Sequence, residues 1–221
     1  MTKQTKQETS NCSNSQLFER IAQDLQTKGY SINPSALPLD LAGSLSTHIQ
    51  QLAANKFNPA GIGRKQAHKL SDVVRSDKIC WITDETTVGG DWLNWTSELQ
   101  QFLNRRLFMG LFSFESHFAH YAPGDFYKKH LDAFKGDANR VLSLVVYLNH
   151  NWSEEDGGEL VMYVDEHDET GFKVNPYLGT VVIFLSEEFP HAVLPSIRDR
   201  YSIAGWFRVN TSNTKHVDPP R

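Results

Sequence analysis

The second half of the chain is dense in short segments with the alternating pattern of β-strands. Between residues 111 and 210, apolar and polar side chains alternate, and glycine, proline and acidic residues separate the runs. The runs are SFESHFAHYA, RVLSLVVYLN, GGELVMYV, GTVVIFL, FPHAVLP and RYSIAGWFRV. Six or more short strands without helices between them favour an antiparallel sandwich or barrel. We therefore expect residues 111–210 to form the β core.

The first half has the helical period instead. Apolar residues recur three or four positions apart in three segments, and the segment 13–110 therefore reads as a helical layer. The expected inward-facing residues are Leu17, Phe18, Ile21 and Leu25, then Leu41, Leu45, Ile49 and Leu52, and finally Trp95, Leu99, Phe102 and Leu103.

Local signals suggest where these helices begin and end. Ser13 and Gln16 have the spacing of a capping box, Gly29 suits a helix end, and the second and third helices are expected near Pro38 and over 91–107. A loop is expected over about 60–82, ending in a strand at 78–82. The polar segments 1–12 and 211–221 are expected to be a disordered lead-in and a frayed tail.

Composition excludes several classes of protein. A net charge of −4 gives no basic bias towards nucleic acid, and no apolar run has the length of a membrane span. The two cysteines, Cys12 and Cys80, do not suggest a disulfide framework, so we expect a reducing, cytoplasmic setting. The sequence leaves the oligomeric state open.

Most of the nine histidines suit an ordinary structural role, but three acid–base residues form a candidate metal set. His130 and Asp132 share one side of a predicted strand, since i and i+2 point the same way. His191 opens a strand 59 residues after Asp132. Two histidines and one carboxylate that leave open positions suit non-haem Fe(II), and catalytic zinc is the rival ion.

Arg200 suggests that an anion accompanies the metal. It follows His191 by nine residues, on the next predicted strand. A buried arginine needs a carboxylate, and its planar fork suits a bidentate pair. A salt bridge with Asp199 is the simpler alternative. Tyr147 ends a strand face with Ser143 and Val145, and its hydroxyl needs a partner if it is buried.

Several stretches together resemble a known family. They are RSDKICWI (75–82), YAPGDFYKKHLD (121–132), YLNHNW (147–152), DGGEL (156–160), FPHAV (189–193) and RYSIAGWF (200–207). In order and spacing they resemble Fe(II)/2-oxoglutarate-dependent dioxygenases, in the prolyl 4-hydroxylase branch related to the hypoxia-inducible-factor prolyl hydroxylases. The resemblance covers about residues 75–208 and implies a double-stranded β-helix, a jelly roll of cupin type, behind the helical layer.

The resemblance also implies a role for individual residues. His130, Asp132 and His191 correspond to the iron ligands, while Arg200 and Tyr147 correspond to the groups that hold the distal carboxylate of 2-oxoglutarate. The remaining assignments are Tyr121 at the iron-proximal end of the cosubstrate, Leu160 and Val193 as pocket walls, Trp206 beside the site, and Asp77 with Arg140 as an ion pair at the substrate entrance.

The function implied is hydroxylation of a proline in a protein substrate, with Fe(II), 2-oxoglutarate and O2, and with L-ascorbate as reductant. The acidic insert over 164–176 departs from the animal enzymes, and a compact chain is more similar to bacterial members that act on translation elongation factor Tu. Two alternatives stay open: an oxygenase acting on a free amino acid or other small molecule, and a non-catalytic metal-binding jelly roll that senses a ligand or oxygen. Lys128 and Lys129 are read as a solvated pair.

Overall fold

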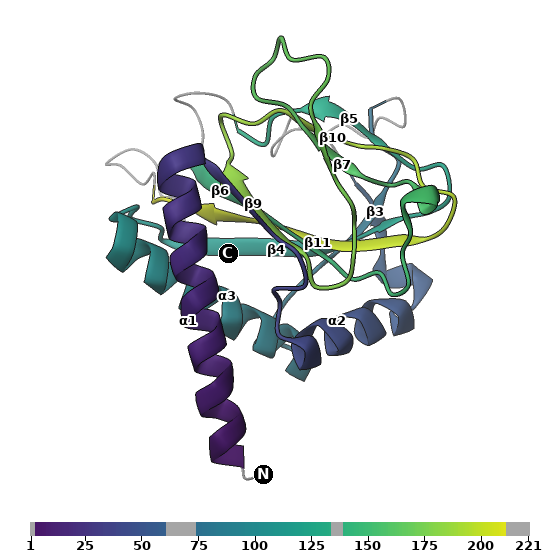
Figure 1. Ribbon diagram of the computed structural model, residues 1–221. Helices are drawn as coiled ribbons and strands as arrows, with labels where there is room; N and C mark the ends of the chain where they lie inside the picture. The colour runs from purple at the N-terminus through teal and green to yellow at the C-terminus, as the bar shows by residue number, and fades with distance from the viewer. Residues whose placement is uncertain (1–2, 61–73, 134–138, 211–221) are drawn as a thin grey trace, which may run out of the picture.

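The computed structural model describes residues 3–60, 74–133 and 139–210, with side chains described from Asn14 onward. Three helices precede or interrupt the first strands: α1 (Lys3–Lys28), α2 (Leu39–Gln51) and α3 (Thr87–Leu107). They lie along one side of the β core (Figure 1). None of these described helices combines the length and apolarity that a membrane-spanning segment needs.

The described strands form two antiparallel sheets. The major sheet has the order β1-β9-β6-β11-β4-β3-β2, and the minor sheet has the order β5-β10-β7-β8. The strands are β1 (Tyr30–Asn33), β2 (Asn58–Pro59), β3 (Lys78–Trp81), β4 (Ser113–Tyr121), β5 (Tyr127–His130), β6 (Arg140–Tyr147), β7 (Leu160–Met162), β8 (Phe172–Val174), β9 (Val181–Leu185), β10 (His191–Val193) and β11 (Arg200–Arg208). The expected jelly roll is confirmed, with a helical layer behind it.

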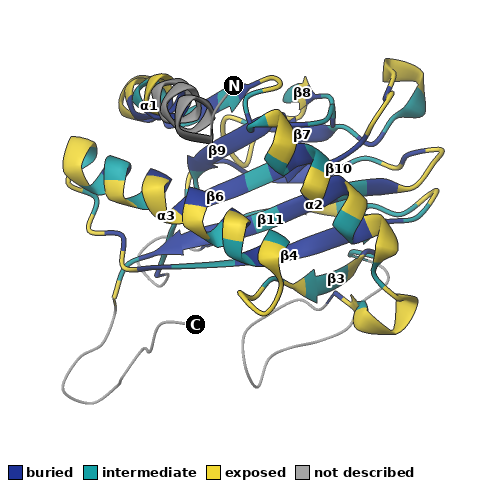
Figure 2. Ribbon diagram, turned by 90° about the horizontal axis from the view of Figure 1, so that it is seen from below, coloured by how far each residue is buried: buried dark blue, intermediate teal, exposed yellow. Residues whose placement is uncertain are grey.

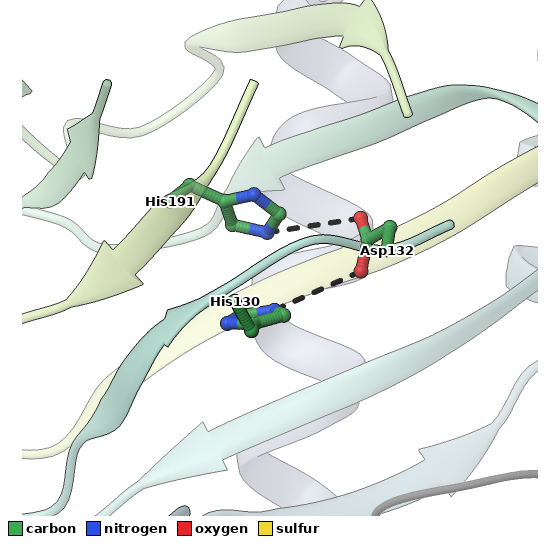
Figure 3. A group of neighbouring side chains, drawn as sticks. All are labelled: His130, Asp132 and His191. Carbon is green, nitrogen blue, oxygen red and sulfur yellow. Dashed lines mark ion pairs between the residues drawn. The ribbon is translucent and has the colours of Figure 1, made fainter. Parts of the chain in front are cut away.

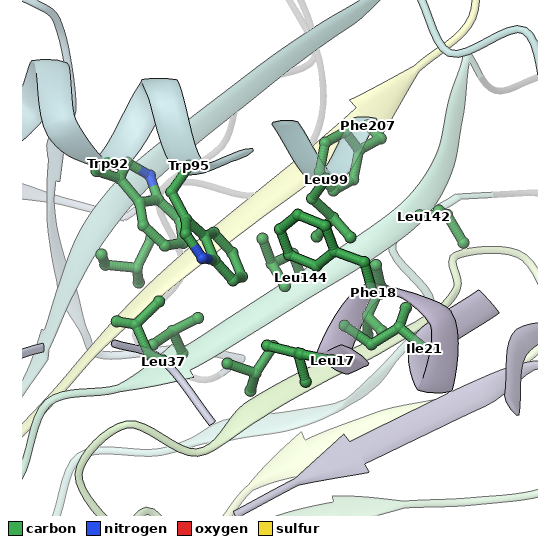
Figure 4. Packing of buried hydrophobic residues seen from close by; sticks show 14 of the residues in the cluster. Leu17, Phe18, Ile21, Leu37, Trp92, Trp95, Leu99, Leu142, Leu144 and Phe207 are labelled. Carbon is green, nitrogen blue, oxygen red and sulfur yellow. The ribbon is translucent and has the colours of Figure 1, made fainter. Parts of the chain in front are cut away.

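The major sheet separates two apolar clusters. Its outer face packs under the helices, where Leu142 and Leu144 of β6 contact the cluster that contains Phe18 of α1 and Leu99 of α3 (Figure 4). Its inner face packs against the minor sheet through a second cluster, which contains Tyr147. Figure 2 shows the buried strands beneath helices whose outward sides are exposed. Alternation along β6 therefore assigns successive side chains to the helical core or to the space between the sheets.

The helix boundaries differ from the sequence expectation at the N-terminus. Helix α1 runs from Lys3 without interruption, so most of the segment 1–12 is helical here, and a capping box at Ser13 is wrong because Ser13 lies inside the helix. The segment before Gly29 contains no glycine or proline to stop a helix, and Gly29 itself ends it with a φ of 77°.

The first residues of the other two helices agree more closely with the sequence expectation. Helix α2 begins after Pro38, as expected. Helix α3 begins at Thr87, four residues before the expected 91, because the Thr86 hydroxyl accepts a hydrogen bond from the Gly89 amide. Residues 61–73 of the expected loop and the tail 211–221 lie outside the described residues.

Candidate active site

The three candidate metal ligands converge in the structure. His130 ends β5 and His191 opens β10, and the two residues lie directly opposite each other in the antiparallel pair. The Nε2 atoms of His130 and His191 lie 3.7 Å from Oδ1 and Oδ2 of Asp132, respectively (Figure 3). Their possible ligand atoms all lie within 4.8 Å of one another. Asp132 lies in the bend after β5, so the strand argument placed it on the correct side although the strand has already ended.

Neighbouring groups orient each ligand. The Nδ1 of His130 donates to the Lys128 carbonyl at 2.8 Å, and the Nδ1 of His191 donates to the Phe189 carbonyl at 3.1 Å. Each imidazole therefore presents the lone pair of Nε2 towards Asp132, as second-shell hydrogen bonds to metal-binding histidines do. The Ser143 hydroxyl donates to Oδ2 of Asp132 at 2.6 Å. Two nitrogens and one carboxylate thus face a common point, which fits Fe(II).

The protonation states also suit a divalent cation. Burial, followed by the neighbouring His191, lowers the pKa of His130 to about 3. Burial alone would raise the pKa of Asp132, but His191, His130 and the hydrogen bond from Ser143 outweigh it and hold that pKa below its usual range. At neutral pH the His130 imidazole is neutral and the carboxylate is charged, and these are the forms that bind metal ions.

Arg200 lies at the other end of the inner face, fully buried with 1% of its surface exposed. Its Nε donates to the Gly158 carbonyl at 2.7 Å, and its Nη1 donates to the Ser202 hydroxyl at 3.3 Å. Within the described part of the chain, no carboxylate pairs with it. Asp199 instead lies 2.7 Å from Nε2 of His120, so the simpler alternative for Arg200 is wrong.

Two tyrosine rings flank this guanidinium. Its central carbon lies 5.0 Å from the Tyr121 ring centroid and 5.1 Å from that of Tyr147. The Tyr147 hydroxyl is buried without a hydrogen-bond partner among the described residues. Burial raises the pKa of Tyr147 to about 12, so the hydroxyl is a neutral donor. A buried cation beside an unpaired donor fits the distal carboxylate of 2-oxoglutarate.

Apolar side chains pack between the two sheets beside the strands that carry His191 and Arg200. Leu160 of β7 lies opposite Val193 of β10, and both are buried in the cluster between the sheets, together with Tyr121 and Tyr147. These four residues belong to one cluster, and their expected roles around the cosubstrate stay predictions. A cosubstrate bound between the sheets would be shielded from water by these side chains.

Comparison with known proteins identifies the family. Residues 116–208 match the 2OG-Fe(II) oxygenase superfamily. The solved structure of a prolyl-4-hydroxylase from Pseudomonas putida is 38% identical, with a TM-score of 0.78 over 87% of this chain and 98% of that chain. The chain belongs to the 2OG-Fe(II) oxygenase superfamily.

Three further matches are more distant. A Trichoplax adhaerens prolyl hydroxylase, solved with a peptide of the hypoxia-inducible factor, shares the fold with a TM-score of 0.76 at 24% identity, over 94% of each chain. The mouse and human proteins named prolyl hydroxylase EGLN3 are 31% identical over 85 residues. That stretch is 38% of this chain and spans about a third, 35%, of those curated relatives.

One expected contact of this oxygenase is wrong. Asp77 does not pair with Arg140: it lies 2.6 Å from Arg75, whereas Arg140 lies 2.8 Å from Glu115 and stacks on Trp206 at 3.6 Å. Arg75 is two residues from Asp77 and reaches it locally. The side chain of Arg140, on β6, extends over the Trp206 ring of β11 and reaches Glu115 on β4. Substrate-binding roles for Asp77 and Arg140 stay predictions.

Sequence reasoning missed other groups around the site. The strand pattern predicts that Ser143 lies on the same strand face as Tyr147. Its position in the sequence does not indicate the hydrogen bond to Asp132. Its hydroxyl is also 2.9 Å from that of Ser186, for which the sequence holds no signal. Lys129 is not simply solvated, because its Nζ donates to the carbonyls of Glu166 and Asp168 at 2.9 and 2.8 Å. Lys129 thus binds the acidic insert to β5 directly beside the candidate metal ligand His130.

Proposed function

We propose that this protein is an Fe(II)- and 2-oxoglutarate-dependent prolyl 4-hydroxylase that acts on a proline in a protein. One observation carries the proposal: a buried Arg200, and a Tyr147 hydroxyl with no hydrogen-bond partner among the described residues, lie between the same two sheets as His130, Asp132 and His191. This arrangement has a place for a metal ion and a separate place for a carboxylate. The similarity to a Pseudomonas putida prolyl-4-hydroxylase supports proline as the target.

The residues have distinct tasks in this proposal. His130, Asp132 and His191 would bind Fe(II), while Arg200 and Tyr147 would hold the distal carboxylate of 2-oxoglutarate. With dioxygen, this cofactor system supplies the oxidative decarboxylation that yields succinate and CO2 and transfers one oxygen atom to a C–H bond. The chain's own contribution is to orient the cosubstrate and to exclude water with Leu160 and Val193. Trp206 and Arg140 would border the entering peptide.

Translation elongation factor Tu is the substrate we propose to test first, because the chain resembles bacterial members of this branch, and a prolyl-4-hydroxylase from Pseudomonas putida is 38% identical. L-Ascorbate is proposed as the reductant that keeps the metal in the Fe(II) state between turnovers. Neither proposal depends on the other, so each has its own arm in the experiment.

The experiment measures succinate and proline oxidation together. Purified protein is incubated in air with Fe(II) and 2-oxoglutarate, with or without elongation factor Tu, and with or without ascorbate. We expect succinate formation to rise with the substrate, one proline to gain one oxygen atom, and ascorbate to prolong turnover. Asp132→Ala serves as the control and should abolish turnover while the circular-dichroism spectrum is retained.

Other outcomes distinguish the alternatives. Succinate without proline modification in the factor or in a cell extract would point to a small-molecule substrate. Binding of metal and 2-oxoglutarate without any turnover would point to a sensor. Full activity of Asp132→Ala would contradict the metal assignment itself.

A further inference from the structure

Strand β5 contains an irregularity next to the metal ligand it carries. In the pairing with β10, His130 lies opposite His191 and Tyr127 lies opposite Val193. These partners are two residues apart on β10 but three apart on β5, so β5 holds one extra residue, as a β-bulge does. Side chains three apart on a regular strand point to opposite faces. The bulge removes this separation and brings Tyr127 and His130 to the same side.

The two rings are stacked as a result. Their centroids are 3.5 Å apart, and their planes differ by 15°. The hydrogen bond from Nδ1 of His130 to the Lys128 carbonyl restrains one edge of the imidazole. The stack with Tyr127 restrains the plane of the ring, which a single hydrogen bond leaves free to rock. Together, the two contacts fix the direction in which Nε2 points.

Arg75 holds the tyrosine in place. Its guanidinium carbon lies over the Tyr127 ring, 4.3 Å from the centroid. Because His130 already covers one face at 3.5 Å, Arg75 covers the other. A cation over an aromatic face is stabilising, and more so where water is excluded. Tyr127 is thus held between a metal ligand and a cation.

Asp77 in turn fixes Arg75. Nε and Nη2 of Arg75 donate to the two carboxylate oxygens of Asp77 at 2.7 and 2.6 Å, and the Asp77 side chain is fully buried. A bidentate pair of this kind sets the plane of the guanidinium as well as its position. The charged pair therefore determines where the cation lies over Tyr127.

The backbone joins the same segments. The Lys128 amide donates to the Val74 carbonyl at 2.9 Å, and the Ser76 amide donates to the Phe126 carbonyl at 3.2 Å. The Phe126 amide donates to the Ser76 hydroxyl at 3.1 Å. Residues 74–77 therefore lie along the outer edge of β5, the strand whose other edge pairs with β10. Any displacement of this segment acts on the strand that carries His130.

We propose that Asp77, Arg75 and Tyr127 form a relay of positioning residues that fixes the imidazole of His130 and so sets the strength and geometry of metal binding. The relay rests on the proposed function, since it assigns these residues to the metal centre of that function. It gives Asp77 a task different from the expected pair with Arg140. It also implies that a peptide that displaces Arg75 acts on the metal ligand through Tyr127.

Cobalt(II) binding to the metal-free protein tests the relay without catalysis. The dissociation constant is measured by calorimetry and the ligand geometry by the visible absorption of bound Co(II). Tyr127→Leu should weaken binding about tenfold, in the range seen when partners of metal ligands are removed, and should change the Co(II) spectrum. Tyr127→Phe keeps the stack and should behave like the unaltered protein. Asp77→Asn should change the spectrum in the same direction as Tyr127→Leu.

The chain offers a matched control. Tyr201 stacks on His120 with centroids 4.9 Å apart and planes 18° apart, and His120 is no part of the metal set. Tyr201→Leu should leave the Co(II) affinity and spectrum unchanged. Thermal unfolding of each metal-free variant shows whether it is folded at the measuring temperature.

The possible failures are separable. Unaltered affinity and spectrum in Tyr127→Leu would overturn the relay while leaving the metal site intact. Equal losses in Tyr127→Phe and Tyr127→Leu would also overturn it, because the stack survives in the former. If the unaltered protein binds no Co(II), the proposed function fails together with the relay.

Discussion

At the scale of single residues, Arg200 is a buried charge whose hydrogen bonds, within the described residues, reach only neutral oxygens, those of Gly158 and Ser202. Leaving a cation in this position is costly unless an anion joins it. The rigid, planar guanidinium of an arginine suits this position if the anion is a carboxylate that must be held in one orientation. The identity of the residue, and not only its charge, is therefore expected to matter.

Arg200→Lys tests this requirement. A lysine keeps the charge but loses the second parallel hydrogen bond, so affinity for 2-oxoglutarate should fall roughly ten- to a hundredfold, as for loss of a charged hydrogen bond. The protein loaded with Mn(II) is titrated with 2-oxoglutarate by calorimetry. Arg198→Lys is the control, because Arg198 is half-exposed and pairs with Asp156. Equal affinities for Arg200→Lys and the unaltered protein would contradict the role of Arg200.

His117 is a second buried residue with a measurable consequence. Burial, followed by the charges of Arg75 and Arg140, lowers its pKa to about 3, while Asp132 acts in the opposite direction. The unfolded chain, with a histidine pKa of about 6.5, therefore binds a proton that the folded chain does not bind between about pH 6.5 and 3. The free energy of unfolding should fall as the pH falls through this window, by about 1 kcal/mol per pH unit from this residue.

His117→Leu should remove that contribution. Urea unfolding of the metal-free protein, repeated at several pH values between 7 and about 4, should show a shallower pH dependence for the variant. The stability of each protein at pH 7 serves as its own reference. The prediction concerns how the free energy of unfolding changes with pH, and not its absolute value. Parallel pH profiles of the two proteins would show that His117 is not the source.

At the scale of elements, the acidic insert is ordered by hydrogen bonds to a few atoms. The Asp168 carboxylate accepts from the amides of Val164, Thr170 and Gly171. Lys129 donates to the carbonyls of the same turn and lies over the Tyr163 ring at 4.2 Å. The insert then continues into β8, which pairs with β7. Two adjacent residues of β5 thus have different contacts: His130 belongs to the metal set, and Lys129 contacts the insert.

Lys129→Met should loosen the turn without unfolding the sheet. Two charged hydrogen bonds and a cation–π contact are lost, so the amides of Thr170 and Gly171 should exchange with deuterium several-fold faster. Hydrogen exchange followed by mass spectrometry measures this over a peptide spanning the insert. Lys128→Met is the matched control, since its exposed side chain shows no such contact among the described residues. Equal exchange in all three proteins would count against the Lys129 contact.

At the scale of the whole molecule, the major sheet keeps two cores apart. The helical core contains Leu99, which is fully buried, and the inner core contains the site residues Tyr121 and Tyr147. The sheet lies between the two cores, so a change in one core reaches the other mainly through the sheet. Stability and cosubstrate binding should therefore be separable by mutation.

Leu99→Ala tests this separation. The cavity should lower the free energy of unfolding by about 3 kcal/mol, and the thermal midpoint by several degrees, with the 2-oxoglutarate affinity unchanged at a temperature where the variant is folded. Phe108→Ala is the control, because that side chain is 89% exposed and its removal should alter stability little. A parallel loss of affinity in Leu99→Ala would show that the two cores are coupled.

The amino-acid sequence by itself determined the elements and the chemical types of the site. Alternation along β6 and β11 and the helical period around Leu99 are local patterns that burial imposes, and they predicted a β core behind helices. Residue type and spacing made His130, Asp132 and His191 a candidate metal set with iron and zinc both open, and the role predicted for Arg200 depended on the family resemblance. Tyr147 was identified by its face of the strand.

Only the tertiary structure decided which charged groups pair. Asp77 pairs with Arg75, two residues away. Arg140 pairs with Glu115 across β11, because the order of the strands and the Trp206 ring between them determine what the Arg140 side chain can reach. The stack of Tyr127 on His130 depends on one extra residue in β5, which becomes visible only when β5 is paired with β10. Strand pairing is a long-range property, and the pattern along a single strand does not contain its register.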